Sequence, residues 1–360
     1  MSAAPDISVI MSVYNGEAYL EEAVNSVLNQ TFQNWELIVI NDCSTDCTAQ
    51  ILQRYAESDS RVKVYTNEVN LRLPSSLNKA LALAKGKYIA RMDADDICLP
   101  QRLEKQFAFM EANPQVDLSS CRFMTLKNGK ISSGGCGGKT DSESIKALLL
   151  VTNPVLHPGI IAKSSVIRTL GYDKTFTCTE DMELWTRFVM GGYSIRILSE
   201  YLMVYRLHDK QITGTTLDRQ RKEVVEIQKR YFGKFLQPMD EAREAFYIKG
   251  IYFREETDIL KFIDFYKWLR AENRRTGAFE KNSLSYAMLE ILAEYKRKGI
   301  SKGALLKALL VFDPVFLMRE LRERKRRASN DGRTCIAYAQ SIGLVQSGGT
   351  LECPEFSRKI

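Results

Sequence analysis

The densest group of acidic side chains follows an apolar run over residues 88–92 and consists of Asp93, Asp95 and Asp96. A buried strand that ends in carboxylates delivers oxygen ligands to the edge of a sheet, where open α/β sheets bind their ligands. Asp93 and Asp95 stand two residues apart, a spacing that suits a hard divalent cation that also holds substrate phosphates. The alternative is an ordinary acidic turn at the end of a strand.

The first half of the chain alternates between two apolar patterns. Runs typical of mostly buried strands occupy residues 7–13, 36–40, 62–65 and 88–92. Helical spacing lies between and after them, near residues 18–28, 51–55, 77–84 and 103–110. For the third of these helices, Ser75 or Ser76 is a candidate cap and Gly86 a stop. Such alternation predicts an α/β fold, with a mostly parallel sheet covered by helices on both faces.

Polar residues with a possible function follow the first two predicted strands. Tyr14 comes after the first strand, and its aromatic ring can stack on a base. Asp42 comes after the second, where a carboxylate can accept the ring N–H of a base or bind a ribose hydroxyl. Residues 44–46, Ser-Thr-Asp, are explained at least as well by helix capping.

Four motifs together resemble one known family. They are SVIMSVYN at residues 8–15, NDCSTD at 41–46, DADD at 93–96 and ED at 180–181. Their order resembles that of family 2 glycosyltransferases, over roughly residues 6–215. Members of that family have the GT-A fold, which is Rossmann-like, use nucleotide-diphospho-sugars and invert the anomeric centre. The resemblance therefore implies an inverting glycosyltransferase of the hexosyltransferase type.

The resemblance also implies roles for individual residues on the donor side. Asp93 would reach the ribose or the metal, and Asp95 would be the main protein ligand of Mg²⁺ or Mn²⁺. Two departures concern the nucleotide loop: Cys43 stands where the family usually has glycine, and Arg72 stands where glycine is common. The residues implied to line the nucleotide pocket are Ser12, Tyr14, Glu17 and Asp42, with Asn78 and Arg91 as further members.

The chemistry of transfer is implied to lie in a second segment, residues 179–185. The family places its general base at the Asp of the Glu-Asp pair, here Asp181, which would take the proton of the attacking hydroxyl. The alternative is that this acid only caps a helix. Three residues are assigned to the acceptor side by resemblance: His157, Glu180 and Trp185. His208 resembles a histidine that some relatives bring to the metal or diphosphate, although either histidine can instead be structural.

The chain divides by composition into a catalytic domain at residues 1–215, a helical region at 216–327 and a tail at 328–360 without a clear period, expected to be disordered. The net charge of +7 is concentrated in the helical region, where the apolar run at residues 305–312 precedes a basic run at 322–327. Such a segment can lie on an anionic membrane surface, or simply pack with its basic face in solvent. No recognition motif accompanies the charge, which disfavours a nucleic-acid partner.

The predicted location follows from what the sequence lacks. The first strand begins by about Ile7, which leaves no room for a signal peptide, and no apolar run approaches the roughly 20 residues of a membrane span. We therefore expect a cytoplasmic protein, with peripheral attachment to the inner face of the cell membrane as an option.

Three function classes compete. The resemblance favours transfer from a nucleotide-diphospho-sugar, with a UDP-sugar preferred, to a hydroxyl of a glycan, and a lipid-linked glycan of surface polysaccharide biosynthesis is expected. A sugar-nucleotide pyrophosphorylase would carry a Gly-rich loop with Arg and Lys after the first strand, and residues 12–15 do not form one. A non-catalytic nucleotide-sugar-binding relative would not need both Asp95 and Asp181.

Overall fold

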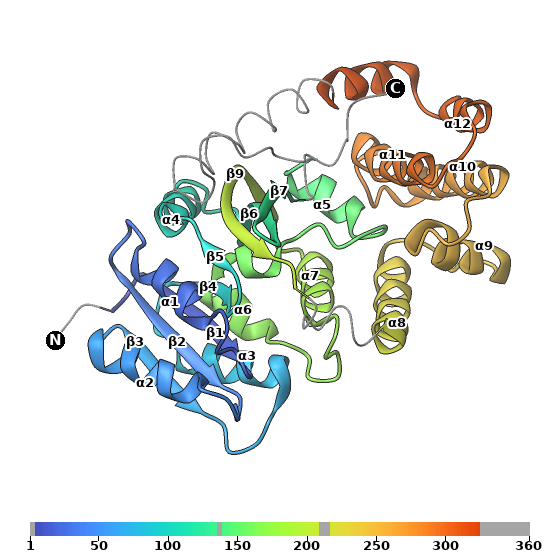
Figure 1. Ribbon diagram of the computed structural model, residues 1–360. Coiled ribbons are helices and arrows are strands. Elements are labelled where there is room, and N and C mark those ends of the chain that lie inside the picture. The colour runs from blue at the N-terminus through green and yellow to red at the C-terminus, as the bar shows by residue number, and fades with distance from the viewer. Residues whose placement is uncertain (1–3, 135–138, 209–216, 325–360) are drawn as a thin grey trace. The chain divides into compact units, whose positions relative to one another are not determined.

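The computed structural model describes residues 4–134, 139–208 and 217–324 of the 360-residue chain (Figure 1). These residues form two compact units: the first holds 4–134, 155–208 and 217–220, and the second holds 139–154 and 221–324. The boundary expected at residue 215 stays a prediction. Residues 139–154 precede that boundary in the sequence and pack in the second unit. The expected tail at 328–360 lies outside the described residues.

The N-terminal half of the first unit has the predicted alternation of strands and helices. Strands β1 and β2 are apolar and almost entirely buried because both faces of the sheet are covered there, whereas β3 is only partly buried. The strands are β1 (Ile7–Val13), β2 (Trp35–Asn41), β3 (Val62–Thr66) and β4 (Tyr88–Asp93). The helices between them are α1 (Leu20–Leu28), α2 (Thr48–Ser58) and α3 (Arg72–Leu83). Parallel pairing joins β3 to β2, β2 to β1 and β1 to β4.

The predicted start of α3 was wrong. The helix begins at Arg72, so Ser75 and Ser76 lie inside its first turns and not at a cap. Ser76 is buried, and its hydroxyl accepts a hydrogen bond from Asn67 at 2.9 Å. The serines were predicted to be caps because short hydroxyl side chains favour helix starts. Here the hydroxyl of Ser76 instead makes a tertiary hydrogen bond with Asn67.

The sheet continues with mixed pairing beyond β4. Its strand order in the described residues is β3-β2-β1-β4-β8-β6-β9-β5, with β7 paired to β6. Strand β8 pairs antiparallel with both β4 and β6, whereas β6 and β9 run parallel. These strands are β5 (Ile97–Cys98), β6 (Leu118–Lys127), β7 (Lys130–Ser133), β8 (Ile161–Lys163) and β9 (Ile195–Arg206). The accompanying helices are α4 (Arg102–Ala112), the 3₁₀ turn η1 (His157–Gly159), α6 (Ser164–Leu170) and α7 (Glu180–Met190).

The second unit is helical, as predicted for the C-terminal region. Its helices pack through aromatic side chains, such as Phe262 against Tyr295 and Tyr266 against Phe312, with ring centroids 5.9 and 4.7 Å apart. The elements are α5 (Ser142–Leu148), α8 (Leu217–Phe235, shared with the first unit), α9 (Glu241–Phe246), the π-helix η3 (Tyr247–Tyr252), α10 (Ile259–Thr276), α11 (Lys281–Arg297), α12 (Lys302–Leu309) and a last helix at 314–324. Among the residues described, no helix combines the length and apolar character needed to cross a bilayer.

Candidate active site

The carboxyl ends of β1, β2 and β4 lie at the same edge of the sheet because these strands run parallel. Ser12 of β1 lies opposite Asp93 of β4 on one side and Ile40 of β2 on the other. Asp42 directly follows β2 and is buried. The fold therefore places three of the predicted donor-side residues at the edge where such sheets bind ligands.

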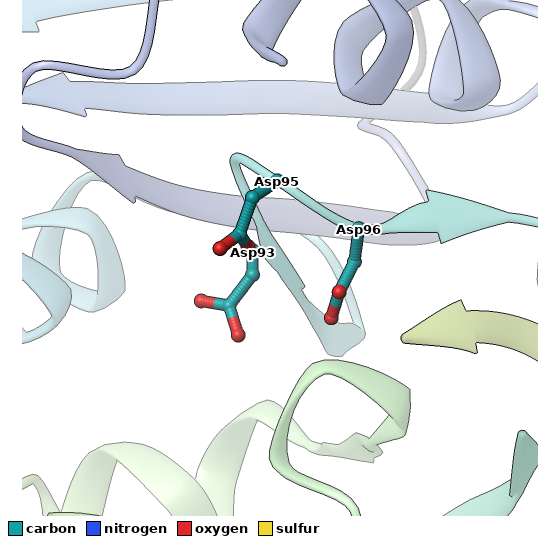
Figure 2. Close-up of side chains that lie close together, drawn as sticks. All are labelled: Asp93, Asp95 and Asp96. Atoms are coloured by element: carbon teal, nitrogen blue, oxygen red, sulfur yellow. The ribbon is translucent and has the colours of Figure 1, made fainter. Parts of the chain in front are cut away.

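Asp93, Asp95 and Asp96 form the carboxylate cluster at this edge. Asp93 ends β4, and the other two lie on the turn to β5, with all three carboxyl groups on the same side of that turn (Figure 2). One oxygen of each lies within 4.8 Å of the others. Asp96 is fully buried, and its Oδ2 atom has no hydrogen-bond partner among the described residues. Three close carboxylates with an unpaired buried oxygen fit a divalent cation.

The charges of the cluster are incompletely compensated. Burial and the neighbouring Asp93 and Asp95 raise the pKa of Asp96 well above its ordinary value. Burial also raises the pKa of Asp93 to about 6, although the Arg91 guanidinium acts in the opposite direction. A bound cation would favour the ionised forms and lower both pKa values.

Arg91 orients the carboxylate of Asp93. Its buried guanidinium makes a bidentate ion pair with Asp93, in which Nη1 donates to Oδ2 and Nη2 donates to Oδ1. Its Nε atom is also buried and has no partner among the described residues. A bidentate pair fixes the carboxylate plane and leaves further lone pairs of Asp93 for a ribose hydroxyl or a metal. Arg91 itself was predicted to lie in the nucleotide pocket.

The end of β9 brings His208 and Arg206 to the carboxylate cluster. His208 Nε2 lies 2.9 Å from Asp95 Oδ2, and the predicted role of His208 at a metal stays a prediction. Arg206 donates its backbone N–H to Asp96 Oδ1 and its Nε–H to the Asp95 carbonyl, both at 2.9 Å. The Tyr19 ring packs against both side chains, with its centroid 4.6 Å from the guanidinium carbon and 5.0 Å from the imidazole centroid. Arg206 was missed because only the pairing of distant strands brings it here.

Asp42 braces the loop that precedes α3. Its Oδ1 atom accepts hydrogen bonds from Asn67 Nδ2 and from the backbone N–H of Leu71, each at 2.8 Å. Two donors on one oxygen hold the carboxylate in place. The predicted pocket residue thus has a structural role in the loop as well.

The loop after β1 and the loop after β2 are tied to each other. Glu17 Oε2 accepts the backbone N–H of Cys47 at 3.0 Å, and Asp46 Oδ2 accepts the N–H of Glu17 at 3.1 Å. Asp46 also accepts the Thr48 N–H at 3.0 Å, but the N-cap residue of α2 is Cys47 and not one of residues 44–46. Tyr14 is 52% exposed at the tip of the first loop, which leaves its ring face open to a base.

Cys43 and Arg72, the two residues that replace expected glycines, adopt a backbone conformation that glycine favours. Cys43 has φ 63° and Arg72 has φ 69°, in the left-handed region. A side chain in that region costs roughly 1–2 kcal/mol relative to the ordinary conformations. Both loops therefore keep a glycine-like path, and the chain holds local strain at these two positions.

Asn78 connects the donor side to the loop after α6. Its Nδ2 donates to the Tyr172 carbonyl and its Oδ1 accepts the Tyr172 N–H, both at 2.8 Å. Asn78 was predicted to lie in the nucleotide pocket. These two hydrogen bonds direct its side-chain amide toward the Tyr172 backbone. Tyr172 in turn donates to or accepts from His157, with its hydroxyl 2.8 Å from Nε2.

The predicted acceptor-side residues lie together around the start of α7. His157 is buried, its ring centroid is 5.6 Å from that of Trp185, and its Nδ1 atom is 3.7 Å from Glu180 Oε1. Burial and the Arg91 charge lower the pKa of His157 well below its ordinary value, so its imidazole is neutral. Burial and the Asp181 charge raise the pKa of Glu180 to about 8, so this acid holds its proton at neutral pH.

Asp181 differs from Glu180 in its surroundings. It is only partly buried in the first turn of α7, whereas Glu180 is buried. Its charge contributes to the raised pKa values of Asp93 and Glu180, which places it within electrostatic reach of both. The fold thus brings two neighbouring acids to one site in different surroundings, one buried and one partly exposed, a pattern that separates acid and base roles in enzymes.

Arg102 supports the site from the core and was not singled out from the sequence. It is fully buried in α4, and its Nη2 atom donates to the carbonyls of Arg91 and Ile160 at 2.8 and 3.0 Å. It therefore holds the end of β4 against the segment that follows η1. Its position at the start of an amphipathic helix gave no signal, because arginine there normally faces solvent.

Comparisons with known proteins find a matching family and similar sequences. The model of the family described as Glycosyl transferase family 2 matches residues 8–134. The O-antigen biosynthesis glycosyltransferase WbnJ of Escherichia coli is 37% identical over 216 residues, which cover 59% of this chain and 83% of WbnJ.

Two solved structures share the fold at lower identity. S. aureus TarS 1-349 in complex with UDP-GlcNAc aligns with a TM-score of 0.56 at 19% identity, over 82% of this chain and 93% of TarS. The mannosyltransferase PcManGT from Pyrobaculum calidifontis, in complex with GDP-Man and Mn²⁺, aligns with a TM-score of 0.52 at 18% identity, over 86% of this chain and 87% of PcManGT. These likenesses confirm the predicted GT-A fold. With its motifs, its fold and its relatives in agreement, the chain belongs to glycosyltransferase family 2.

Proposed function

We propose that this protein transfers a hexose from a nucleotide-diphospho-sugar to a hydroxyl of a glycan, with inversion at the anomeric carbon. The observation that carries the proposal is the cluster of Asp93, Asp95 and Asp96, whose carboxylate oxygens lie within 4.8 Å of one another. Asp181, partly exposed in the first turn of α7, lies within electrostatic reach of Asp93, so the site has both a diphosphate-binding group and a candidate base. Transfer needs both, one for the leaving group and one for the attacking hydroxyl.

In this mechanism the chain's own residues divide the work. The acceptor oxygen attacks the anomeric carbon, its proton passes to an Asp181 oxygen, and the electron pair of the broken C–O bond leaves with the nucleoside diphosphate. Asp181 suits the base because it is partly exposed in the first turn of α7, whereas the neighbouring Glu180 is buried. His157, neutral and bonded to Tyr172, packs against Trp185 and gives the acceptor side a fixed wall.

Asp95, Asp93 and His208 are the residues that would hold Mn²⁺ or Mg²⁺, with Asp96 as a further oxygen donor. Bound there, the ion would stabilise the charge of the departing diphosphate. His208 offers a nitrogen and the aspartates offer oxygens, a donor set that Mn²⁺ accepts readily. Arg206 keeps the turn in place by its bonds to Asp95 and Asp96.

For the donor we favour a UDP-sugar. Ser12, Tyr14, Glu17 and Asp42 would line the nucleotide, with the exposed Tyr14 ring stacking on the base. TarS binds UDP-GlcNAc, which supports uridine, whereas PcManGT binds GDP-Man and supports guanosine as the competing base. A panel of nucleotide sugars separates these options directly.

For the acceptor we favour a lipid-linked glycan of surface polysaccharide biosynthesis at the inner face of the cell membrane. The support is the relationship to WbnJ, whose name assigns it to O-antigen biosynthesis. A pyrophosphorylase remains the alternative enzyme class, and it would form nucleotide sugar from sugar phosphate and nucleoside triphosphate. A non-catalytic relative would bind the nucleotide sugar and release nothing.

The test is the release of UDP or GDP from a panel of nucleotide sugars, with a glycan acceptor and Mn²⁺. We expect one UDP-sugar to release UDP faster than the others, and the acceptor to gain one sugar by mass spectrometry. Pyrophosphate-dependent turnover would assign the pyrophosphorylase class. Binding without release of any nucleotide would assign the non-catalytic class.

A further inference from the structure

The last two helices of the second unit use one face to join the helical core. The buried residues recur at intervals of four: Ala308 in α12, Phe312 in the turn between the two helices, and Phe316 and Glu320 in the helix at 314–324. The Phe312 ring lies 4.7 Å from that of Tyr266 in α10. A helix that packs on a core in this way normally presents polar residues on its other face.

The outer face of these two helices is apolar instead. Leu306 and Leu310 of α12 and its C-cap are 62% and 78% exposed, and they stand four residues apart. Val315 and Met318 of the last helix are 77% and 57% exposed and stand three residues apart. Each spacing puts both side chains on one side of its helix. Four large exposed apolar side chains within thirteen residues form what we call the outer apolar face.

Exposed cations accompany this face, and the acids of the segment are engaged elsewhere. Asp313 binds Lys281 Nζ at 3.1 Å and caps the last helix through the N–H groups of Val315 and Phe316. Glu320 is buried, and Glu323 lies 3.2 Å from Lys139. The exposed basic residues of the same segment are Lys302, Lys307, Arg319 and Arg322.

We propose that the outer apolar face docks the helical unit on an anionic phospholipid bilayer. The four apolar side chains would enter the boundary between headgroups and acyl chains, while the four cations would meet lipid phosphates. Neither helix can span the bilayer, so the attachment is peripheral. A second copy of the chain fits less well, because a two-fold contact sets the same four cations against one another. The proposal rests on this face and not on the proposed transfer reaction.

Flotation of the purified full-length protein with vesicles tests the proposal. We expect the protein to float with phosphatidylglycerol-rich vesicles, to float less with phosphatidylcholine alone, and to be released by high salt. The variant Leu310→Asp/Val315→Asp should lose at least about tenfold in its partition coefficient. Lys307→Gln/Arg319→Gln should lose about fivefold for each cation removed. Leu260→Asp is the matched control, since Leu260 is 72% exposed on α10 of the same unit.

The outcomes separate docking from folding, from self-association and from catalysis. Thermal unfolding of each variant confirms that its fold is retained, and nucleotide release with a water-soluble acceptor reports the active site independently. Equal flotation of wild type and Leu310→Asp/Val315→Asp overturns the proposal, as does the absence of wild-type flotation. A dimer in sedimentation that only this double variant dissociates assigns the face to a second copy, and also overturns it.

Discussion

His208 Nε2 lies 2.9 Å from Asp95 Oδ2, although the two residues are 113 positions apart in the sequence. The contact exists because β9 runs beside β6 and β5, which returns the end of β9 to the turn after β4. The imidazole nitrogen of His208 can therefore orient the Asp95 carboxylate by a hydrogen bond, or bind the same cation as that carboxylate.

His208→Ala should weaken Mn²⁺ binding by about tenfold, since partners that orient or complete a metal site typically contribute that much. Calorimetric titration with Mn²⁺ in the presence of UDP measures the effect. Tyr19→Phe is the matched control because it keeps the ring that packs on His208. Unchanged Mn²⁺ affinity in His208→Ala would show that the imidazole only braces the turn.

Binding and chemistry should separate in two variants. Asp181→Asn should leave nucleotide-sugar affinity within a few-fold and abolish transfer, because the base touches the acceptor and not the nucleotide. Asp42→Ala should weaken UDP binding first, and it also releases the loop held through Asn67 and Leu71. Calorimetry with UDP and a turnover assay on both proteins decide the matter. A large loss of affinity with preserved turnover in Asp181→Asn would reassign that residue.

Relief of backbone strain should raise stability at Cys43. Cys43→Gly removes a side chain at φ 63° and should increase the free energy of unfolding by up to about 1 kcal/mol, after the entropy that glycine adds to the unfolded chain. Cys47→Gly is the control: Cys47 has φ −74°, so glycine there should only destabilise. Urea unfolding compares the two. If both variants lose stability equally, Cys43 holds no strain.

Glu180 should make the stability of the metal-free protein depend on pH. Its pKa is raised to about 8 from an ordinary 4.5, so the folded state favours the protonated acid. The contribution of protonated Glu180 to the free energy of unfolding is complete below about pH 4.5 and is lost as the pH rises toward about 8. Glu180→Gln cannot ionise, so this variant should gain stability relative to wild type across that range, whereas the exposed Glu57→Gln should not. Parallel pH profiles for wild type and Glu180→Gln would contradict the raised pKa.

The sequence predicted the parts of the fold that are encoded locally. Strands β1, β2 and β4 were recognisable because each is buried on both faces, and the acids at residues 93–96 mark the end of β4. The pairing of β6 with β9 joins residues about 80 apart, and no local pattern signals it. Arg206 could therefore not be placed at Asp95 and Asp96 from the sequence.

Buried polar residues were the other limit. Arg102 and Asp96 are fully buried, yet arginine and aspartate on a helix or turn are normally exposed, so their types point away from the core. Cys43 and Arg72 could be recognised only as departures from glycine. That both keep a left-handed backbone depends on the surrounding loops, which over-determine the path of the chain.

The most direct test of the account is the metal dependence of nucleotide release. With the preferred nucleotide sugar and acceptor, EDTA should stop the wild-type enzyme and Mn²⁺ should restore it. Asp95→Ala should lower turnover by about 10²-fold or more at saturating Mn²⁺, because it removes the anchor of a preorganised charge. Equal wild-type activity in EDTA and in Mn²⁺ would contradict the central claim that the carboxylate cluster binds a catalytic cation.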